Sequence, residues 1–243
     1  NHFTMSGFGN KGIAAKVSLF YKRHLVPDTD YWAKKKYEEL KEEIIKIKKD
    51  ADLSVIDVAF DIALAVHGKQ FRANGEPYVD HLLSTAFIVL QSFENEELFL
   101  DLLELTICAA LLHDVKEDYL KNSIANPEIV KIFGKDEQTL MRKIRGVLKK
   151  KMGNCRASIV VDDIDILSKK LPAEANDSVF FNRILNEGDV LVQTIKVADR
   201  QHNLSQPRYK DTVSKTREYL LFGLLFVRDS CALESTRKRF AFR

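Results

Sequence analysis

The spacing of the apolar residues constrains the fold of this chain more than any other feature of its sequence. Within residues 28–50, an apolar side chain recurs every three or four positions, with lysines and glutamates between: Ala33, Tyr37, Leu40, Ile44 and Ile47. This period places the apolar side chains on one face of an α-helix. Similar patterns predict further helices over residues 54–68, 79–93, 96–115, 137–150, 190–204 and 212–234. We therefore expect an all-α fold.

The composition indicates one folded domain. The chain of 243 residues is 45% hydrophobic, contains 10 Gly and 5 Pro, and shows no repeat or low-complexity linker. We expect an N-terminal helical extension over residues 1–50 and a single domain over 51–243. Residues 149–189 form an atypical insert, in which SIVVDDIDIL fits a short strand, a helix start or an ordered loop. We expect the acidic residues of that stretch in a loop or a helix cap: Asp162, Asp163 and Asp165.

Charge, hydropathy and cysteine content exclude several classes of protein. The 38 Lys+Arg and 35 Asp+Glu give a net charge of +3, which does not indicate a DNA-binding protein. The apolar run Tyr219 to Val227 is about half of the ~20 residues that a membrane-spanning helix needs, so we expect no membrane contact. The three cysteines are scattered and form no CxxC pair, which favours a reducing compartment, the cytoplasm.

The segment LLHDVKED concentrates titratable groups at the end of an apolar helix. If the helix continued through it, His113 and Glu117 would share one face, and Asp114 and Asp118 the next. Burying carboxylates in such a helix is unfavourable without a compensating cation. The segment therefore predicts a bound metal ion.

Two other segments carry comparable clusters. KVADRQHN places Asp199 and Asn203 four residues apart, beside Lys196 and Arg200. HGKQFRANGEPYVDH places an arginine and a histidine around a glycine- and proline-containing loop, Arg72 and His81. Two further histidines accompany these segments, and we expect them to be packed or hydrogen-bonded residues and not metal ligands: His67 and His202.

Together, these three segments resemble the hydrolase domain of the RelA/SpoT alarmone family, a branch of the HD-type metal phosphohydrolases. The resemblance covers residues 53–234 and implies an HD-type helical domain. It implies one manganese ion bound by His81, His113, Asp114 and Asp199. Such a mixed nitrogen and oxygen donor set also suits other divalent transition metals.

The resemblance further implies roles for residues around the metal. Glu117 and Asp118 match the acidic pair that handles the hydrolytic water and its protons. Arg72 and Asn203 match residues that contact the substrate. Since no synthetase sequence follows Arg243, we expect a stand-alone small alarmone hydrolase, whose C-terminal helix matches further substrate contacts at two positions, Lys215 and Tyr219.

The activity that follows from the resemblance is removal of the 3′-pyrophosphate from ppGpp or pppGpp, which yields GDP or GTP and lowers the stringent-response alarmone. The chain departs from the family where HLLSTA replaces HPxxVA and where LSQP follows Asn203 in place of a run with a basic residue. Alternative substrates are therefore (p)ppApp, NADPH or a pyrophosphorylated tRNA, with the protein acting as an antitoxin. A non-catalytic module that binds a toxin is a further alternative, and assembly with a second copy of the chain is left open.

Overall fold

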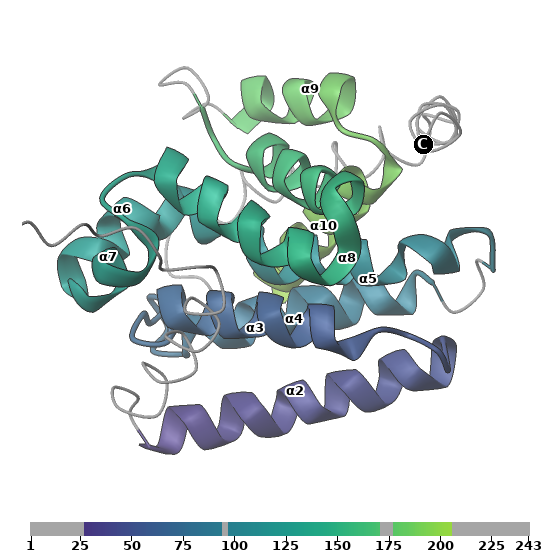
Figure 1. Ribbon diagram of the computed structural model, residues 1–243, viewed down its shortest axis with the longest axis horizontal. Coiled ribbons are helices and arrows are strands. Elements are labelled where there is room, and N and C mark those ends of the chain that lie inside the picture. Colours follow the sequence, from purple (N-terminus) through teal and green to yellow (C-terminus); the bar gives the residue numbers. More distant parts are fainter. Residues whose placement is uncertain (1–26, 94–96, 171–176, 206–243) are drawn as a thin grey trace, which may run out of the picture.

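The computed structural model describes residues 27–93, 97–170 and 177–205, and every regular element in them is a helix (Figure 1). The elements are α2 (Pro27–Ile47), α3 (Leu53–His67), α4 (Tyr78–Gln91), the 3₁₀ helix η1 (Glu97–Leu102), α5 (Leu103–Leu112), α6 (Val115–Ala125), α7 (Glu128–Phe133), α8 (Glu137–Leu167), α9 (Asp177–Glu187) and α10 (Val190–Ser205). The all-α prediction is confirmed. No helix among these residues combines the length and the apolar character needed to cross a bilayer. The predicted helix at 212–234 lies outside the described residues.

Helix α5 lies at the centre of the fold, and all ten of its residues are buried. It packs against α3, α4 and α8, which is consistent with a helix that is apolar around its whole circumference. The single helix predicted over 96–115 is wrong. The chain forms η1 and α5, turns at His113 and Asp114, and only then enters α6. His113 therefore ends one helix and Asp114 precedes another, so the residues of the HDVKED segment do not share one continuous helix.

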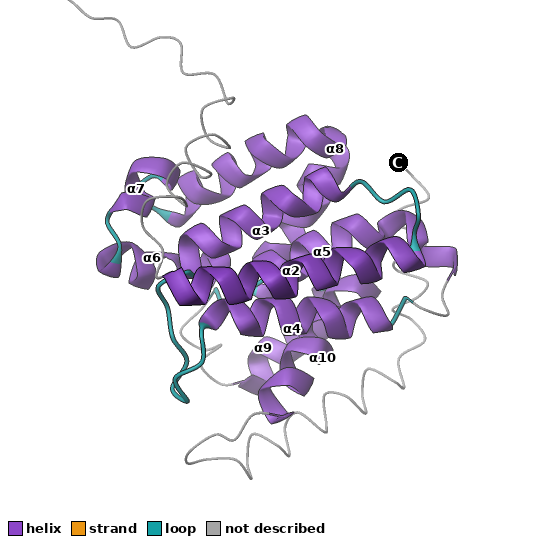
Figure 2. Cartoon of the chain, turned by 90° about the horizontal axis from the view of Figure 1, so that it is seen from below, coloured by secondary structure: helices purple, strands orange, loops and turns teal. Residues whose placement is uncertain are grey.

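Helix α2 joins the core of the domain and packs against α4 (Figure 2). Its apolar face is buried at the positions that the spacing predicted, including Ala33, Leu40 and Ile44. On the same side of the helix, Lys36 forms an ion pair with Asp80 of α4. Helix α2 thus contacts α4, the helix that carries His81.

Helix α8 contains the whole of SIVVDDIDIL, residues 158–167, for which the sequence left strand, helix and loop open. It contains a kink at Gly153, whose φ of 82° is a conformation that glycine adopts without strain. Beyond the kink, the buried residues recur at helical spacing: Ala157, Val160, Ile164 and Leu167. The expectation of a loop or helix cap for Asp162, Asp163 and Asp165 is wrong, because all three lie within α8.

The loop between α3 and α4 folds back on itself and leads directly into the candidate site. The Arg72 N–H donates to the Glu76 carbonyl at 2.8 Å, and Gly75 makes the turn with a φ of 87°. The Tyr78 N–H then donates to the Gln70 carbonyl at 2.9 Å. These bonds hold the loop against the first turn of α4.

One acidic residue of α3 gives a pH-dependent stability prediction. Burial, with repulsion from Asp57, raises the pKa of Asp61 to about 6, against an opposing effect of Lys34. A raised pKa means that ionisation of Asp61 is less favourable in the folded than in the unfolded chain. The neutral carboxyl group therefore does not disfavour folding below pH 3.8, and the free energy of unfolding falls as the pH rises through about 6.

We expect Asp61→Asn to stabilise the protein at neutral pH by about 1 kcal/mol, discounted for the partial exposure of the side chain. The gain over wild type should vanish near pH 4, as measured by thermal unfolding across the pH range. The exposed Asp50→Asn is the control and should give no gain at either pH. A gain for Asp61→Asn that is the same at both pH values would rule out ionisation as its cause.

Candidate metal centre

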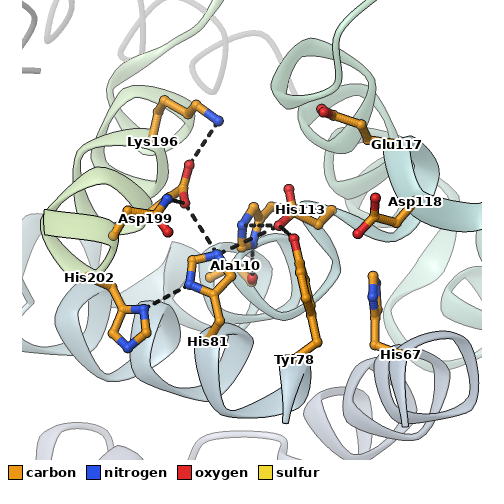
Figure 3. A network of polar contacts seen from close by, with 12 residues as sticks. His67, Tyr78, His81, Ala110, His113, Glu117, Asp118, Lys196, Asp199 and His202 are labelled. Carbon is orange, nitrogen blue, oxygen red and sulfur yellow. Dashed lines mark hydrogen bonds and ion pairs between the residues drawn. The ribbon is translucent and has the colours of Figure 1, made fainter. Parts of the chain in front are cut away.

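Four polar side chains converge between the helices at the centre of the fold (Figure 3). His81 comes from α4, His113 from the end of α5, Asp114 from the start of α6 and Asp199 from α10. Ligand atoms of His81, His113 and Asp114 all lie within 4.8 Å of one another. The His81 Nε2 lies 3.2 Å from the Asp199 Oδ1, and the His113 Nε2 lies 3.1 Å from the Asp114 Oδ2. Three separate sequence segments thus bring two imidazoles and two carboxylates together, with Asp199 joining the group of His81, His113 and Asp114 through its contact with His81.

The electrostatics of this cluster favour a cation. Burial alone would lower the pKa of His113, but Asp114 and Asp199 outweigh it and raise that pKa. Burial would raise the pKa of Asp114, but its contacts with His113 and His81 hold it well below its usual range. The pKa of Asp199 is likewise lowered, because Lys196, Arg200 and His81 outweigh burial. Two ionised carboxylates therefore face the imidazoles, and their field attracts a proton or a metal ion.

The hydrogen bonds of His113 show that the residues fit a metal. Its Nδ1 lies 2.7 Å from the Ala110 carbonyl, which can only accept, so Nδ1 carries the proton. In the neutral ring, Nε2 then has a free lone pair, and this atom is buried without a hydrogen bond. The lone pair faces the Asp114 carboxylate at 3.1 Å, an arrangement that is repulsive unless a proton or a metal ion lies between them. A backbone carbonyl behind the ring is typical of metal-binding histidines.

A second set of residues holds the carboxylates in place. The Tyr78 hydroxyl donates to the Asp114 Oδ2 at 2.6 Å. The Asp199 Oδ2 lies 2.9 Å from the buried Lys196 ammonium, which itself lies 4.8 Å from the ring centroid of Phe180 in α9. The atypical insert therefore contributes an aromatic ring behind the ion pair of Asp199.

Two of the four residues predicted to contact substrate, Arg72 and Asn203, lie beside this cluster and are hydrogen-bonded to it. The Arg72 guanidinium donates to the Asn203 Oδ1 at 2.5 Å. The Asn203 amide in turn donates to the Asp199 Oδ1 at 2.6 Å. The structure thus brings Arg72 and Asn203 together, in contact with one of the carboxylates of the cluster.

The acidic pair of α6 lies on the other side of the cluster from Asp199 (Figure 3). Glu117 is exposed and accepts a hydrogen bond from the Lys169 N–H at 3.4 Å. Although the residue as a whole is exposed, partial desolvation of its carboxyl group and the charge of Asp114 raise the pKa of Glu117. Asp118 is half-buried and accepts a hydrogen bond of 2.7 Å from the Gln70 amide. The two carboxylates therefore lie in different surroundings at adjacent positions.

Gln70 has only one amide orientation consistent with its neighbours. Its Oε1 lies 2.6 Å from the His67 Nδ1 and accepts from the Asn122 amide at 2.8 Å, so its NH₂ group must face Asp118. The sequence reasoning did not single out Gln70 or Tyr78. Both lie inside the HGKQFRANGEPYVDH segment, and a polar residue three positions after His67 was the available signal.

The site residues predicted from sequence therefore fall into two groups. Eight of them lie around the cluster: His81, His113, Asp114, Asp199, Glu117, Asp118, Arg72 and Asn203. Lys215 and Tyr219 lie outside the described residues.

Comparison with known proteins gives matches over the same part of the chain. The HD domain family matches residues 59–219. The GTP pyrophosphokinase rsh of Brucella ovis is 32% identical over 166 residues, which are 68% of this chain and 18% of the relative. The GTP pyrophosphokinase of Myxococcus xanthus is 32% identical over 157 residues, 64% of this chain and 17% of the relative.

A third relative carries the name of a hydrolase. The probable guanosine-3′,5′-bis(diphosphate) 3′-pyrophosphohydrolase of Mycoplasma pneumoniae is 27% identical over 153 residues, which are 63% of this chain and 18% of the relative. The aligned part of this chain thus spans about a fifth of the length of these curated relatives. No solved structure gives a significant match.

Proposed function

Since the chain belongs to the HD domain family and its relatives are of the RelA/SpoT type, we propose that it is a metal-dependent hydrolase of ppGpp and pppGpp. The reaction releases the 3′-pyrophosphate and leaves GDP or GTP. The observation that carries the proposal is the buried cluster itself, in which the His113 Nε2 lies 3.1 Å from the Asp114 carboxylate beside a second histidine and a second aspartate.

We propose His81, His113, Asp114 and Asp199 as the metal ligands and manganese as the metal. A divalent ion held there would polarise a phosphoryl oxygen and make water a better nucleophile. The support from this chain is the donor set itself, since two imidazole nitrogens and two carboxylates suit manganese and its neighbours in the transition series. The Tyr78 hydroxyl and the Lys196 ammonium hold the two carboxylates in position.

We assign the proton transfers to Glu117 and Asp118. One group, as the carboxylate, accepts a proton from the attacking water as the water oxygen bonds to phosphorus. The other, entering as the neutral carboxylic acid, gives its proton to the ribose 3′ oxygen as the P–O bond breaks. The different surroundings of the two groups support this division, because the pKa of Glu117 is raised while Asp118 is held by the Gln70 amide. A carboxyl group with a raised pKa exchanges protons closer to neutral pH.

We assign substrate contacts to Arg72, Asn203, Lys215 and Tyr219. The guanidinium of Arg72 has the planar donor geometry that binds phosphate oxygens in pairs. In the structure, the guanidinium donates to the Asn203 Oδ1. A phosphate oxygen of the substrate would take the place of this amide oxygen as the acceptor. Lys215 and Tyr219 rest on the sequence resemblance alone.

A second candidate function keeps this site and changes the nucleotide. The family's basic residue after Asn203 is replaced here, and the hydroxyl of Ser205 donates to the His202 carbonyl of its own helix. The chain therefore presents no cation at that position, which favours relaxed base choice and extends the candidates to (p)ppApp, NADPH and pyrophosphorylated tRNA. An antitoxin role, the stand-alone form, a cytoplasmic location and self-association remain predictions from the sequence.

The test of the proposed function is a panel of substrates incubated with the purified protein and Mn²⁺: ppGpp, pppGpp, ppApp, NADPH and pyrophosphorylated tRNA. We expect release of pyrophosphate from ppGpp and pppGpp, abolished by a chelator and restored by added Mn²⁺. Turnover of ppApp at a comparable rate would identify the broader enzyme. Inertness toward every compound in the panel, with metal bound, would contradict the hydrolase proposal and favour the toxin-binding alternative.

A further inference from the structure

His202 contacts the ring nitrogen of His81 that points away from the cluster, and it has no part in the mechanism proposed above. It lies on α10 three residues after Asp199 and is 6% exposed. Its Nδ1 lies 2.9 Å from the Nδ1 of His81 (Figure 3). The same atom lies 3.4 Å from the Arg72 guanidinium. One ring nitrogen of His202 therefore faces both a candidate metal ligand and a candidate substrate contact.

The chemistry of these three groups favours one arrangement of protons. A guanidinium has N–H donors and no acceptor, so the Nδ1 of His202 accepts from Arg72 and carries a lone pair. With its Nδ1 as the acceptor, the neutral ring of His202 carries its proton on the other nitrogen, Nε2. An Nδ1 with a lone pair can only accept from His81 as well, so the Nδ1 of His81 carries a proton. In the neutral ring of His81, the remaining lone pair is then on Nε2, the atom that lies 3.2 Å from Asp199 and 3.6 Å from Asp114.

We infer that His202 is a positioning residue that fixes the tautomer and the orientation of His81, so that its Nε2 lone pair points at the metal. The inference rests on the metal site of the proposed function and adds a residue to it. In a site of this type, the partner behind each ligating histidine contributes to metal affinity. The Ala110 carbonyl has this role for His113, and His202 has it for His81.

The same contacts link Arg72 to two metal ligands. One chain of hydrogen bonds runs from Arg72 through His202 to His81, and the other runs through Asn203 to Asp199. The guanidinium of Arg72, which is assigned to phosphate binding, is thus hydrogen-bonded through one intermediate residue to each of two proposed metal ligands, His81 and Asp199. This arrangement predicts that changes at Arg72 alter metal affinity as well as substrate affinity.

The direct test is the tautomer of each ring at neutral pH in wild-type protein loaded with the diamagnetic ion Zn²⁺, which occupies the position between the His81 Nε2 and the two carboxylates. Two-bond ¹H–¹⁵N correlation spectra distinguish the two neutral tautomers, and the sequence contains only six histidines to assign. We expect the Nε2–H form for His202 and the Nδ1–H form for His81. The opposite pair of tautomers, or rapid exchange between the two forms in either ring, would overturn the inference.

The second test is metal affinity, measured by titration of Mn²⁺ into metal-free protein. His202→Leu removes the acceptor at similar size and should weaken Mn²⁺ binding by about tenfold to a hundredfold. His202→Asn offers an amide oxygen in place of Nδ1 and should restore most of the affinity. The exposed Gln201→Leu on the same helix is the matched control and should bind Mn²⁺ like wild type.

The outcomes separate this inference from the proposed function. If wild type binds no metal, the proposed metal site fails, whereas unchanged affinity in a folded His202→Leu variant overturns only the role of His202. Equal loss in the Leu and Asn variants would also overturn it, because it would show that the imidazole is needed for packing and not as an acceptor. Should the Leu variant not fold, the tautomer measurement on wild type decides the question.

Discussion

Replacing His113 with alanine is expected to abolish both Mn²⁺ binding and turnover of ppGpp. The side chain is fully buried, its Nδ1 is held by the Ala110 carbonyl, and its Nε2 faces the carboxylate of Asp114. Losing a ligand removes several kcal/mol of transition-state stabilisation, which corresponds to a loss of at least about a thousandfold in turnover. Asp114→Ala should give the same result, measured as pyrophosphate release and as Mn²⁺ affinity.

The control for these ligand variants is Asp162→Asn, which changes an exposed carboxylate on α8 and should behave like wild type. Circular dichroism of each variant shows whether the helices are retained. Metal-dependent turnover that persists in both His113→Ala and Asp114→Ala would reject this assignment of the site.

The second large effect is expected at the acidic pair of α6, and it should leave the metal in place. Asp118→Asn and Glu117→Gln keep the size of each side chain and remove its ability to carry a proton. General acid and base groups contribute about 10²–10⁴ to the rate, so we expect kcat to fall by that factor in each variant. Mn²⁺ affinity should stay at the wild-type value, because neither residue is a proposed ligand.

The combination of lost turnover and retained metal distinguishes this prediction from the first. Asp162→Asn again serves as the carboxylate-to-amide control. If Asp118→Asn and Glu117→Gln both kept wild-type kcat, the acid and base would have to be sought elsewhere. If both lost Mn²⁺ together with turnover, the pair would belong to the ligand shell.

Much of the helical architecture follows from the spacing of apolar residues. The face of α2 is an example, since the predicted Ala33, Leu40 and Ile44 are all fully buried. The spacing could not reveal the break at His113 and Asp114, because the apolar pattern of α5 runs up to the break and the helical pattern resumes directly after it. The turn between α5 and α6 places both side chains in the same cluster, which is a tertiary feature that spacing alone does not encode.

The segment 158–167 was ambiguous for a physical reason. It alternates β-branched and acidic residues, a composition that suits a strand as well as a helix. The buried face formed by Val160, Ile164 and Leu167 depends on packing against the rest of the core, which is a tertiary effect.

For the site, the sequence identified residue types but not their partners. Asp114 and Asp199 were singled out because charged residues are rare on apolar helices, and His81 because it follows a glycine- and proline-containing loop. The structure brings the three residues together. The bonds from Arg72 to Asn203 and His202 join positions more than 100 residues apart, so no local pattern could predict them. Such contacts exist only once α10 is packed beside α4.

The central claim is that two histidines and two aspartates from remote segments hold one metal ion. The most direct measurement is anomalous X-ray scattering at the manganese edge from a crystal of the protein grown with Mn²⁺. We expect a single strong anomalous peak enclosed by His81, His113, Asp114 and Asp199. A map without density at that point, or with the ion bound only by other residues, would contradict the account.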